Sequence, residues 1–145
     1  MNMNAIPEGF VPLPAFTAGF IAANGPLHVR LHDGRVQLGF RVEARHCNPM
    51  SICHGGMLAT FCDMLLPICA HRQNDEVGMR FLPTIQLSVD YLAPAALGAW
   101  VQGEADVLRV TRSMVFAQGL VAADGVPVAR TSGILKLGTP MAGVR

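Results

Sequence analysis

One carboxylate stands in an otherwise apolar segment and is the residue of this chain best placed to do chemistry. Asp63 is the only charged side chain between Met57 and Ala70. A carboxylate buried among apolar residues is costly unless it is paired or protonated. Such surroundings also tune a carboxylate to act as a base or a nucleophile, so Asp63 is our first catalytic candidate. A purely structural aspartate, satisfied by backbone groups or an arginine, is the competing interpretation.

Two glycines and two polar side chains precede this segment. If Gly55 and Gly56 open a helix, its first N–H groups have no side chains over them, and a carbonyl oxygen or small anion can approach. In an acyl-transfer site such donors stabilise the oxyanion, although paired glycines also simply mark tight turns. Asn48 and His54 could hydrogen-bond a substrate carbonyl, and Asn48 before Pro49 could equally be a turn residue.

The spacing of His54 and Asp63 carries a further prediction. Nine positions separate them. In a continuous helix, at about 100° and 1.5 Å per residue, their side chains point to opposite sides and lie about 13 Å apart along the axis. The two residues therefore cannot meet within one chain. If both serve one reaction, the site must lie at a twofold interface between two copies.

A metal site is not expected. Cysteines near His54 invite a zinc interpretation, but the sequence has no Cys-x-x-Cys motif or spaced histidine pair. The cysteines are expected to be reduced, as small apolar or reactive groups. They are Cys47, Cys53, Cys62 and Cys69. The remaining histidines are expected at the surface or in structural roles: His28, His32, His46 and His71.

The elements that position these residues follow from the apolar pattern. The segment from Gly55 to His71 is apolar nearly all round, which predicts a long helix buried on most of its surface. Pro67 predicts a kink or an early end there. A short helix is predicted over Ala15 to Ala23, ended by Asn24-Gly25-Pro26.

Six strands are predicted around this helix. Leu27 to Leu31 and Arg35 to Val42 alternate apolar and polar residues about an Asp-Gly turn, which indicates a hairpin. Four more strands follow, at Thr84 to Tyr91, Ala99 to Val110, Met114 to Ala122 and Val126 to Leu137. One long helix wrapped by about six mostly antiparallel strands is an α+β arrangement. At 145 residues we expect a single domain over 1–145, with 1–24 as an N-terminal extension.

Composition excludes some classes of function. The chain is 51% hydrophobic and 14% charged, and burial of apolar surface in an oligomer would explain this high apolar fraction. No apolar run is long enough to cross a membrane. A formal charge of +1 without a basic run argues against nucleic-acid binding. The N-terminus lacks the pattern of a secretory signal, so a cytoplasmic location is expected.

The motifs together resemble a known family. Asn48-Pro49-x-x-x-x-His54-Gly55-Gly56-Met57, with Asp63 following and Asp90-Tyr91-Leu92-x-Pro94-Ala95 later, resembles the hotdog-fold acyl-CoA thioesterases of the phenylacetate-pathway (PaaI-like) type. The resemblance covers about Gly25 to Leu137. It implies a hotdog fold, a homodimer with a continuous sheet around paired helices, and commonly a homotetramer of two such dimers.

The resemblance also implies roles for single residues. Asp63 would act as nucleophile or as general base on water, and the Gly55 amide would polarise the thioester carbonyl. Asn48 and His54 would orient the thioester or the water, and the Thr84 hydroxyl would assist the carboxylate. Asp63 and Thr84 would come from one subunit and the other three residues from its partner. Coenzyme A would be part of the substrate, so no separate cofactor is implied.

Several points stay open at the level of sequence. Many relatives have glycine three residues before the histidine, where this chain has Ser51, so the loop must manage without glycine's freedom at positive φ. Arg109 and Arg112, at a turn between strands, are candidates for binding the phosphates of coenzyme A, or simply solvated charges. The alternatives are a hotdog hydratase or dehydratase and a non-catalytic acyl-CoA binding module. The acyl group remains open.

Overall fold

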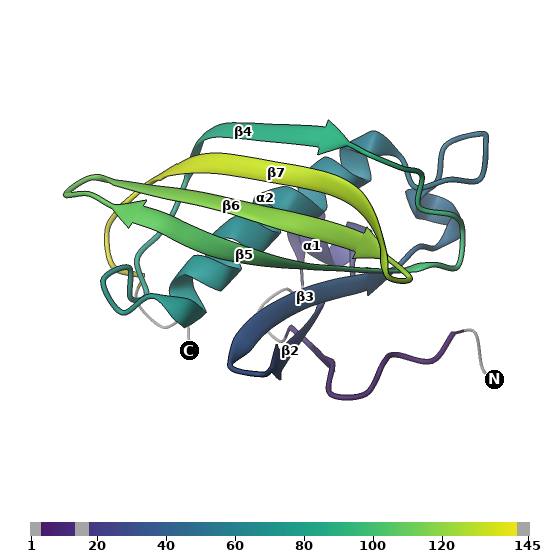
Figure 1. Ribbon diagram of the computed structural model, residues 1–145, viewed down its shortest axis with the longest axis horizontal. Helices are drawn as coiled ribbons and strands as arrows, with labels where there is room; N and C mark the ends of the chain where they lie inside the picture. Colours follow the sequence, from purple (N-terminus) through teal and green to yellow (C-terminus); the bar gives the residue numbers. More distant parts are fainter. Residues whose placement is uncertain (1–3, 14–17, 142–145) are drawn as a thin grey trace.

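A long apolar helix lies across one face of a seven-stranded antiparallel sheet (Figure 1). The computed structural model describes residues 4–13 and 18–141. The helices are α1 (Gly19–Asn24), the 3₁₀ turn η1 (Ala44–His46) and α2 (Gly55–Gln73). The strands are β1 (Val11–Pro12), β2 (His28–His32), β3 (Arg35–Arg41), β4 (Thr84–Tyr91), β5 (Trp100–Val110), β6 (Met114–Ala123) and β7 (Val126–Lys136). The sheet order is β1-β2-β3-β5-β6-β7-β4.

The predicted α+β architecture is confirmed, with the helix wrapped by the sheet. All six predicted strands are present, each within one residue of its predicted bounds. The seventh, β1, is a two-residue strand at the sheet edge, where Val11 pairs with Val29. Alternation could not reveal it, because two residues, one of them a proline, are too few to form a pattern.

The two predicted helices differ from the observed ones at their ends. The early end at Pro67 is wrong, because α2 continues through it to Gln73. The lost backbone hydrogen bond is offset by packing, since most side chains around the proline are buried against the sheet. The short helix begins at Gly19 rather than Ala15, and residues 15–17 of that prediction lie outside the described residues.

A diagonal row of glycines on the inner face of the sheet receives α2. Gly119 in β6 lies two residues from the residue that pairs with Gly103 in β5. Gly133 in β7 likewise lies two residues from the residue that pairs with Gly119. A Cβ atom on Gly103 would lie 2.8 Å from Leu65 Cδ2, and one on Gly133 would lie 2.7 Å from Leu66 Cδ1. The row therefore lets the helix backbone approach closely, and it follows the oblique crossing seen in Figure 1.

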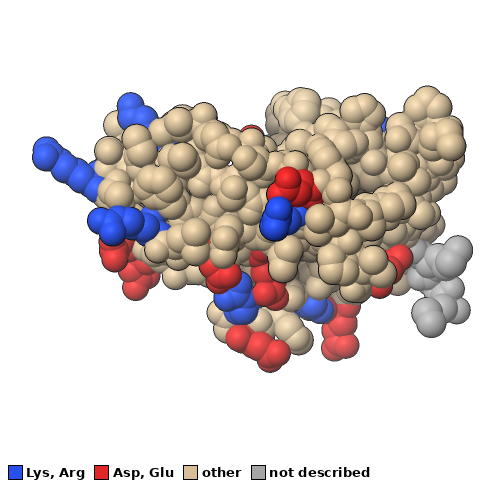
Figure 2. All heavy atoms as spheres, turned by 45° about the horizontal axis from the view of Figure 1, so that its top comes forward, with Lys and Arg blue, Asp and Glu red and all other residues tan. Residues whose placement is uncertain are grey.

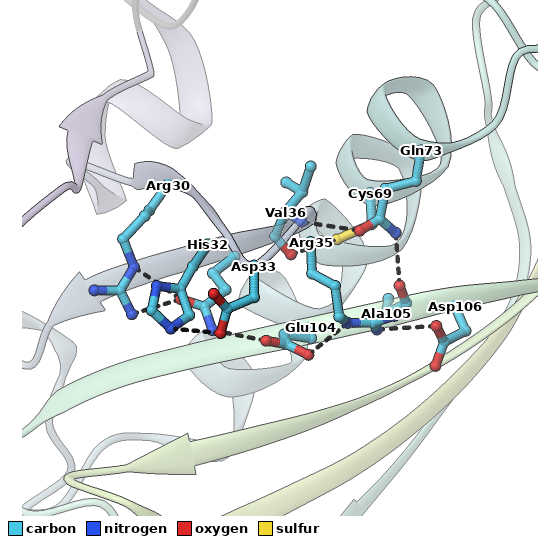
Figure 3. A network of polar contacts seen from close by, with 11 residues as sticks. Arg30, His32, Asp33, Arg35, Val36, Cys69, Gln73, Glu104, Ala105 and Asp106 are labelled. Atoms are coloured by element: carbon cyan, nitrogen blue, oxygen red, sulfur yellow. Dashed lines mark hydrogen bonds and ion pairs between the residues drawn. The ribbon is translucent and has the colours of Figure 1, made fainter.

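The C-terminal turn of α2 is tied to two strands (Figure 3). The backbone pairing of β3 with β5 runs from Arg41 to Leu38 and no further. Beyond it, the side chain of Gln73 accepts from the Val36 N–H and donates to the Ala105 carbonyl, both at 2.9 Å. Gln73 thus continues the hydrogen bonding where the two strands separate.

The outer face of the same strands carries a polar network (Figure 3). Arg35 bridges Glu104 at 2.8 Å and Asp106 at 2.9 Å. Gln37 donates to Glu104 and accepts from Arg30, which connects β2, β3 and β5. Within the described part of the chain, no helix is long and apolar enough to span a membrane.

Candidate functional site

The carboxylate singled out in the sequence is held by a hydroxyl from the edge strand. Thr84 Oγ1 donates to Asp63 Oδ1 at 2.6 Å, joining the start of β4 to the middle of α2. Asp63 is half-buried in this single chain. Among the described residues, no lysine or arginine pairs with it and Oδ2 makes no hydrogen bond. One oxygen is therefore fixed by a neutral donor, and the other remains open to a ligand.

The start of α2 presents two free hydrogen-bond donors, His54 Nε2–H and the Gly55 N–H. The Gly56 N–H donates to His54 Nδ1 at 2.8 Å, so that nitrogen is the acceptor and Nε2 carries the proton of the neutral ring. The His54 side chain is exposed, which leaves Nε2–H free to donate. The Gly55 N–H makes no hydrogen bond within the described part of the chain. These donors could bind a carbonyl oxygen.

The structure changes one part of the prediction for His54 and Asp63. The two side chains do not point to opposite sides of one helix, but they are far apart along its axis as predicted. His54 is the N-cap, with φ −59° and ψ 137°, and its ring turns back onto Gly56 instead of projecting from a helical turn. Gly55 is the first helical residue, so eight residues of rise place Asp63 about 12 Å further along the axis. The structure does not bring His54 and Asp63 together through any contact within one chain.

A cavity of about 310 Å³ lies beside His54. Its lining includes Phe20 from α1 and Arg45 after β3, with His54, Gly56, Met57 and Thr60 from the start of α2. Most of the lining side chains are polar, since Asn24 and His46 also contribute, and the apolar side chains are Phe20 and Met57. The cavity adjoins the free donors and is large enough for part of an acyl thioester.

The loop before the helix is fixed by Asn48. Its Oδ1 accepts from the N–H groups of Met50 at 2.9 Å and Ile52 at 3.4 Å, so Asn48 has the turn role considered from the sequence. Its side-chain amide remains a free donor among the described groups. Ser51 has a φ of 59°, so this position requires the left-handed region that favours glycine.

Tyr91 contacts the start of α2, a contact that sequence reasoning missed. Its hydroxyl donates to the Gly55 carbonyl at 2.7 Å, from the end of β4 to the start of α2. Tyr91 stands in the motif that carries the family resemblance, but no contact or role was predicted for it, because a tyrosine ending a strand is ordinary. Its partner is a backbone group, which no spacing of side chains can reveal.

The two arginines considered for phosphate binding lie at a distance from these donors. Arg109 in β5 and Arg112 in the turn before β6 are both exposed, and neither forms a hydrogen bond or ion pair in the described part of the chain. Figure 1 places the β5–β6 turn at the end of the sheet where β4 begins, opposite the end where α2 begins. They are therefore nearer in the fold to the Thr84 end than to Gly55.

Buried His46 and partly buried His71 have backbone partners, whereas buried His28 packs against Trp100 and its Nδ1 has no hydrogen-bond partner among the described groups. His46 Nδ1 accepts from the Glu43 N–H, and its Nε2 lies 2.6 Å from the Asn24 carbonyl. His71 Nε2 lies 2.7 Å from the Arg80 carbonyl. Across residues 4–13 and 18–141, no group of three potential metal-ligating side chains gathers.

The cysteines near the site are poor rivals to Asp63 as nucleophiles. Burial raises the pKa of Cys53 to about 12 and the pKa of Cys62 to about 11. Both therefore remain protonated thiols at neutral pH, and the thiolate is the reactive form. All four cysteines are free.

Comparison with known proteins gives consistent matches. The family described as "Thioesterase superfamily" matches residues 50–129. A Pseudomonas aeruginosa protein named "Putative esterase PA0474" is 28% identical over 93% of this chain and 99% of its own length. A mutant of the phenylacetic acid degradation protein PaaI from Thermus thermophilus is 23% identical, with a TM-score of 0.66 over 79% of this chain and 95% of that one.

A third comparison involves a structure with coenzyme A. The BH2602 protein from Bacillus halodurans, solved with CoA, is 22% identical, with a TM-score of 0.66 over 74% of this chain and 71% of that chain. At such identities the two solved structures show a shared fold. The expected hotdog fold is thereby confirmed, and the family match over residues 50–129 confirms the resemblance to thioesterases.

Proposed function

The chain belongs to the thioesterase superfamily, the thioester hydrolases, and on that premise we propose that it hydrolyses acyl-CoA thioesters at a site completed by a second copy. The observation that carries the proposal is the Thr84–Asp63 contact. This contact fixes one oxygen of the Asp63 carboxylate and leaves the other open. The first turn of the same helix offers the unpaired Gly55 N–H. Together these supply a base or nucleophile and an oxyanion contact.

In the proposed reaction, Asp63 acts on water or directly on the thioester. As a base, its open oxygen takes a proton from water while the water oxygen bonds to the thioester carbon. The carbonyl oxygen gains negative charge, which the Gly55 N–H and His54 Nε2–H stabilise. The carbon–sulfur bond then breaks, and the proton held by Asp63 passes to the departing thiolate. As a nucleophile, Asp63 would form an anhydride that water hydrolyses to the same products.

The edge of the sheet supports assembly of two copies. Among the described residues, strand β4 pairs only with β7, so its other edge has no strand partner there, and several apolar side chains near it are exposed. They are Phe81, Ile85, Tyr91 and Leu92. Such an edge invites pairing with another strand. Figure 2, which brings this side forward, shows charged side chains mainly at the lower and left margins, one acidic and basic pair near the middle, and broad areas without charge around that pair.

The exposed stripe of α2 fits the same assembly. Gly56, Ala59, Thr60, Asp63 and Pro67 share one face of the helix, and none of them is buried. Mostly small side chains allow a second helix to approach. If two α2 helices run antiparallel, Asp63 of one copy comes near the helix start of the other. Asp63 and Thr84 would then complete a site with Asn48, His54 and Gly55 of the second copy.

Coenzyme A is proposed as the thiol part of the substrate. The comparison protein from Bacillus halodurans contains CoA, which supports this choice of ligand. Arg109 and Arg112 are unpaired cations near the Thr84 end of the sheet and remain our candidates for its phosphates. Replacing both by alanine should raise KM and leave kcat nearly unchanged.

Replacing Asp63 with asparagine tests the proposal. Thiol release from a panel of aryl, short-chain and medium-chain acyl-CoA substrates should fall at least about a hundredfold with the best substrate. Binding of free coenzyme A, measured by calorimetry, should stay within about twofold, because asparagine has nearly the same shape. Unchanged thiol release would exclude Asp63 from catalysis. Binding without turnover in the wild type would indicate a binding module.

A further inference from the structure

Two aromatic rings hold the single peptide group that links the glycines of the site. Tyr91 Oη donates to its carbonyl oxygen, on Gly55, at 2.7 Å. His54 Nδ1 accepts from its N–H, on Gly56, at 2.8 Å. Both ends of this peptide are therefore fixed by side chains, one from β4 and one from the helix cap.

The same rings explain why both positions are glycine. A Cβ on Gly55 would lie 3.3 Å from the Cζ and hydroxyl of Tyr91, and a Cβ on Gly56 would lie 3.0 Å from His54 Nδ1. Each glycine is thus in tight contact with the ring that binds its peptide. Two adjacent glycines have the greatest backbone freedom of any pair, so a helix start built from them needs such restraint to keep one geometry.

We propose that Tyr91 is a positioning residue, whose hydroxyl holds the first turn of α2 so that the Gly55 N–H keeps a fixed direction towards the thioester oxygen. The inference rests on the proposed function. Donors that stabilise an oxyanion are effective because they are oriented before the reaction begins. Tyr91 supplies that orientation through the Gly55 carbonyl and does not itself take part in the chemistry.

The protonation of Tyr91 suits this role. Although about half of the side chain is exposed, partial desolvation raises the pKa of Tyr91 above the ordinary value for tyrosine. The hydroxyl therefore stays protonated through neutral and mildly alkaline pH and can donate to a carbonyl throughout. A deprotonated tyrosine would instead repel that oxygen.

The placement of Tyr91 also gives β4 a double role. Thr84 at its start binds Asp63, and Tyr91 at its end binds Gly55 of the same chain. In an assembly where each site takes Asp63 from one copy and Gly55 from the other, one β4 strand supports parts of both sites. A shift of this strand would then change both sites together.

The test is Tyr91→Phe, which removes only the hydroxyl. With the best acyl-CoA substrate of the wild type, kcat should fall about tenfold, less than the loss of an oxyanion donor itself. KM and the Kd of free coenzyme A should stay within about twofold, because binding contacts are retained. The control is Ser132→Ala, which removes an exposed hydroxyl from β7 and should leave kcat unchanged.

The outcomes separate this inference from the proposed function. An unchanged kcat in Tyr91→Phe overturns the positioning role. A rise in KM and in the coenzyme A Kd, with kcat unchanged, also overturns it, because Tyr91 would then contact the substrate. If Asp63→Asn retains full activity, the proposed function itself fails, whatever Tyr91→Phe does.

Discussion

At the level of single residues, the hydroxyl of Thr84 decides how Asp63 is presented. It fixes Oδ1 and leaves Oδ2 free. Thr84→Val keeps the shape and removes the donor, so kcat should fall about tenfold or more as the carboxylate loses its orientation. Thiol release measures this, and Thr84→Ser, which keeps the hydroxyl, should retain most of the activity. Equal activity in the valine and serine variants would show that the contact does not serve catalysis.

Ser51 is a second residue of interest, because the backbone strain at its positive φ can be measured as a change in the free energy of unfolding. A non-glycine residue at a φ of 59° is strained by roughly 1 kcal/mol. Ser51→Gly should therefore leave the free energy of unfolding unchanged or raise it by up to about 1 kcal/mol, partly offset by glycine's greater freedom when unfolded. Chemical denaturation measures this. The control is Ser113→Gly, at a turn residue without positive φ, and it should lower the free energy of unfolding. An equal loss of unfolding free energy in both variants would refute strain at Ser51.

The sequence predicted the individual residues of the site better than their contacts. Asp63, His54 and Gly55 stood out because a charge, a histidine and paired glycines interrupt apolar surroundings. The Thr84–Asp63 contact was implied only by family resemblance. The bond from Tyr91 to a backbone carbonyl could not be predicted, because it depends on where β4 packs against α2.

At the level of elements, the fit of α2 on the sheet depends on the glycine row. A Cβ on Gly119 would lie 2.6 Å from the Glu104 carbonyl oxygen, a backbone atom that cannot move without disturbing the sheet. Gly119→Ala should therefore lower the free energy of unfolding by about 1 to 3 kcal/mol. Urea denaturation compared with Gln118→Ala, on the exposed face next to it, measures this; equal stabilities would contradict the close packing.

Alternation predicted the strands well, but not this packing. Period-two patterns and Asp-Gly turns gave six strands to within a residue. Helix α2 ran past Pro67 because tertiary packing outweighed local preference, and Gln73 secured its last turn. The glycine row could not be found without the pairing of the strands, since its three members lie far apart in sequence.

The outer polar network predicts a dependence of stability on pH. Burial opposes ionisation of Glu104, but hydrogen bonds from Gln37 and Arg35 outweigh it and lower its pKa below the ordinary 4.5. Because the folded-state pKa is the lower one, this stabilisation is present above about pH 4.5 and is lost as pH falls below it. Thermal unfolding from pH 7 to pH 3 should show a smaller loss in Glu104→Gln than in the wild type. Identical slopes would rule out a contribution from Glu104.

At the level of the whole molecule, the single chain holds the two groups of proposed site residues apart. Asp63 with Thr84 lies in the middle of α2, and the donors of His54 and Gly55 lie at its start. The unpaired β4 edge and the exposed stripe of α2 are the surfaces on which a second copy would bring these groups together. Assembly and catalysis are therefore coupled in this account.

Mixed dimers test that coupling most directly. Asp63→Asn and His54→Ala proteins, each nearly inactive alone, are unfolded together, refolded in equal amounts and assayed for thiol release. Random pairing makes half of the dimers mixed, and each mixed dimer has one of two sites intact, so about a quarter of wild-type activity should return. If subunit exchange is shown by differently tagged chains and activity stays at the mean of the parents, the site lies within one chain and the account is wrong.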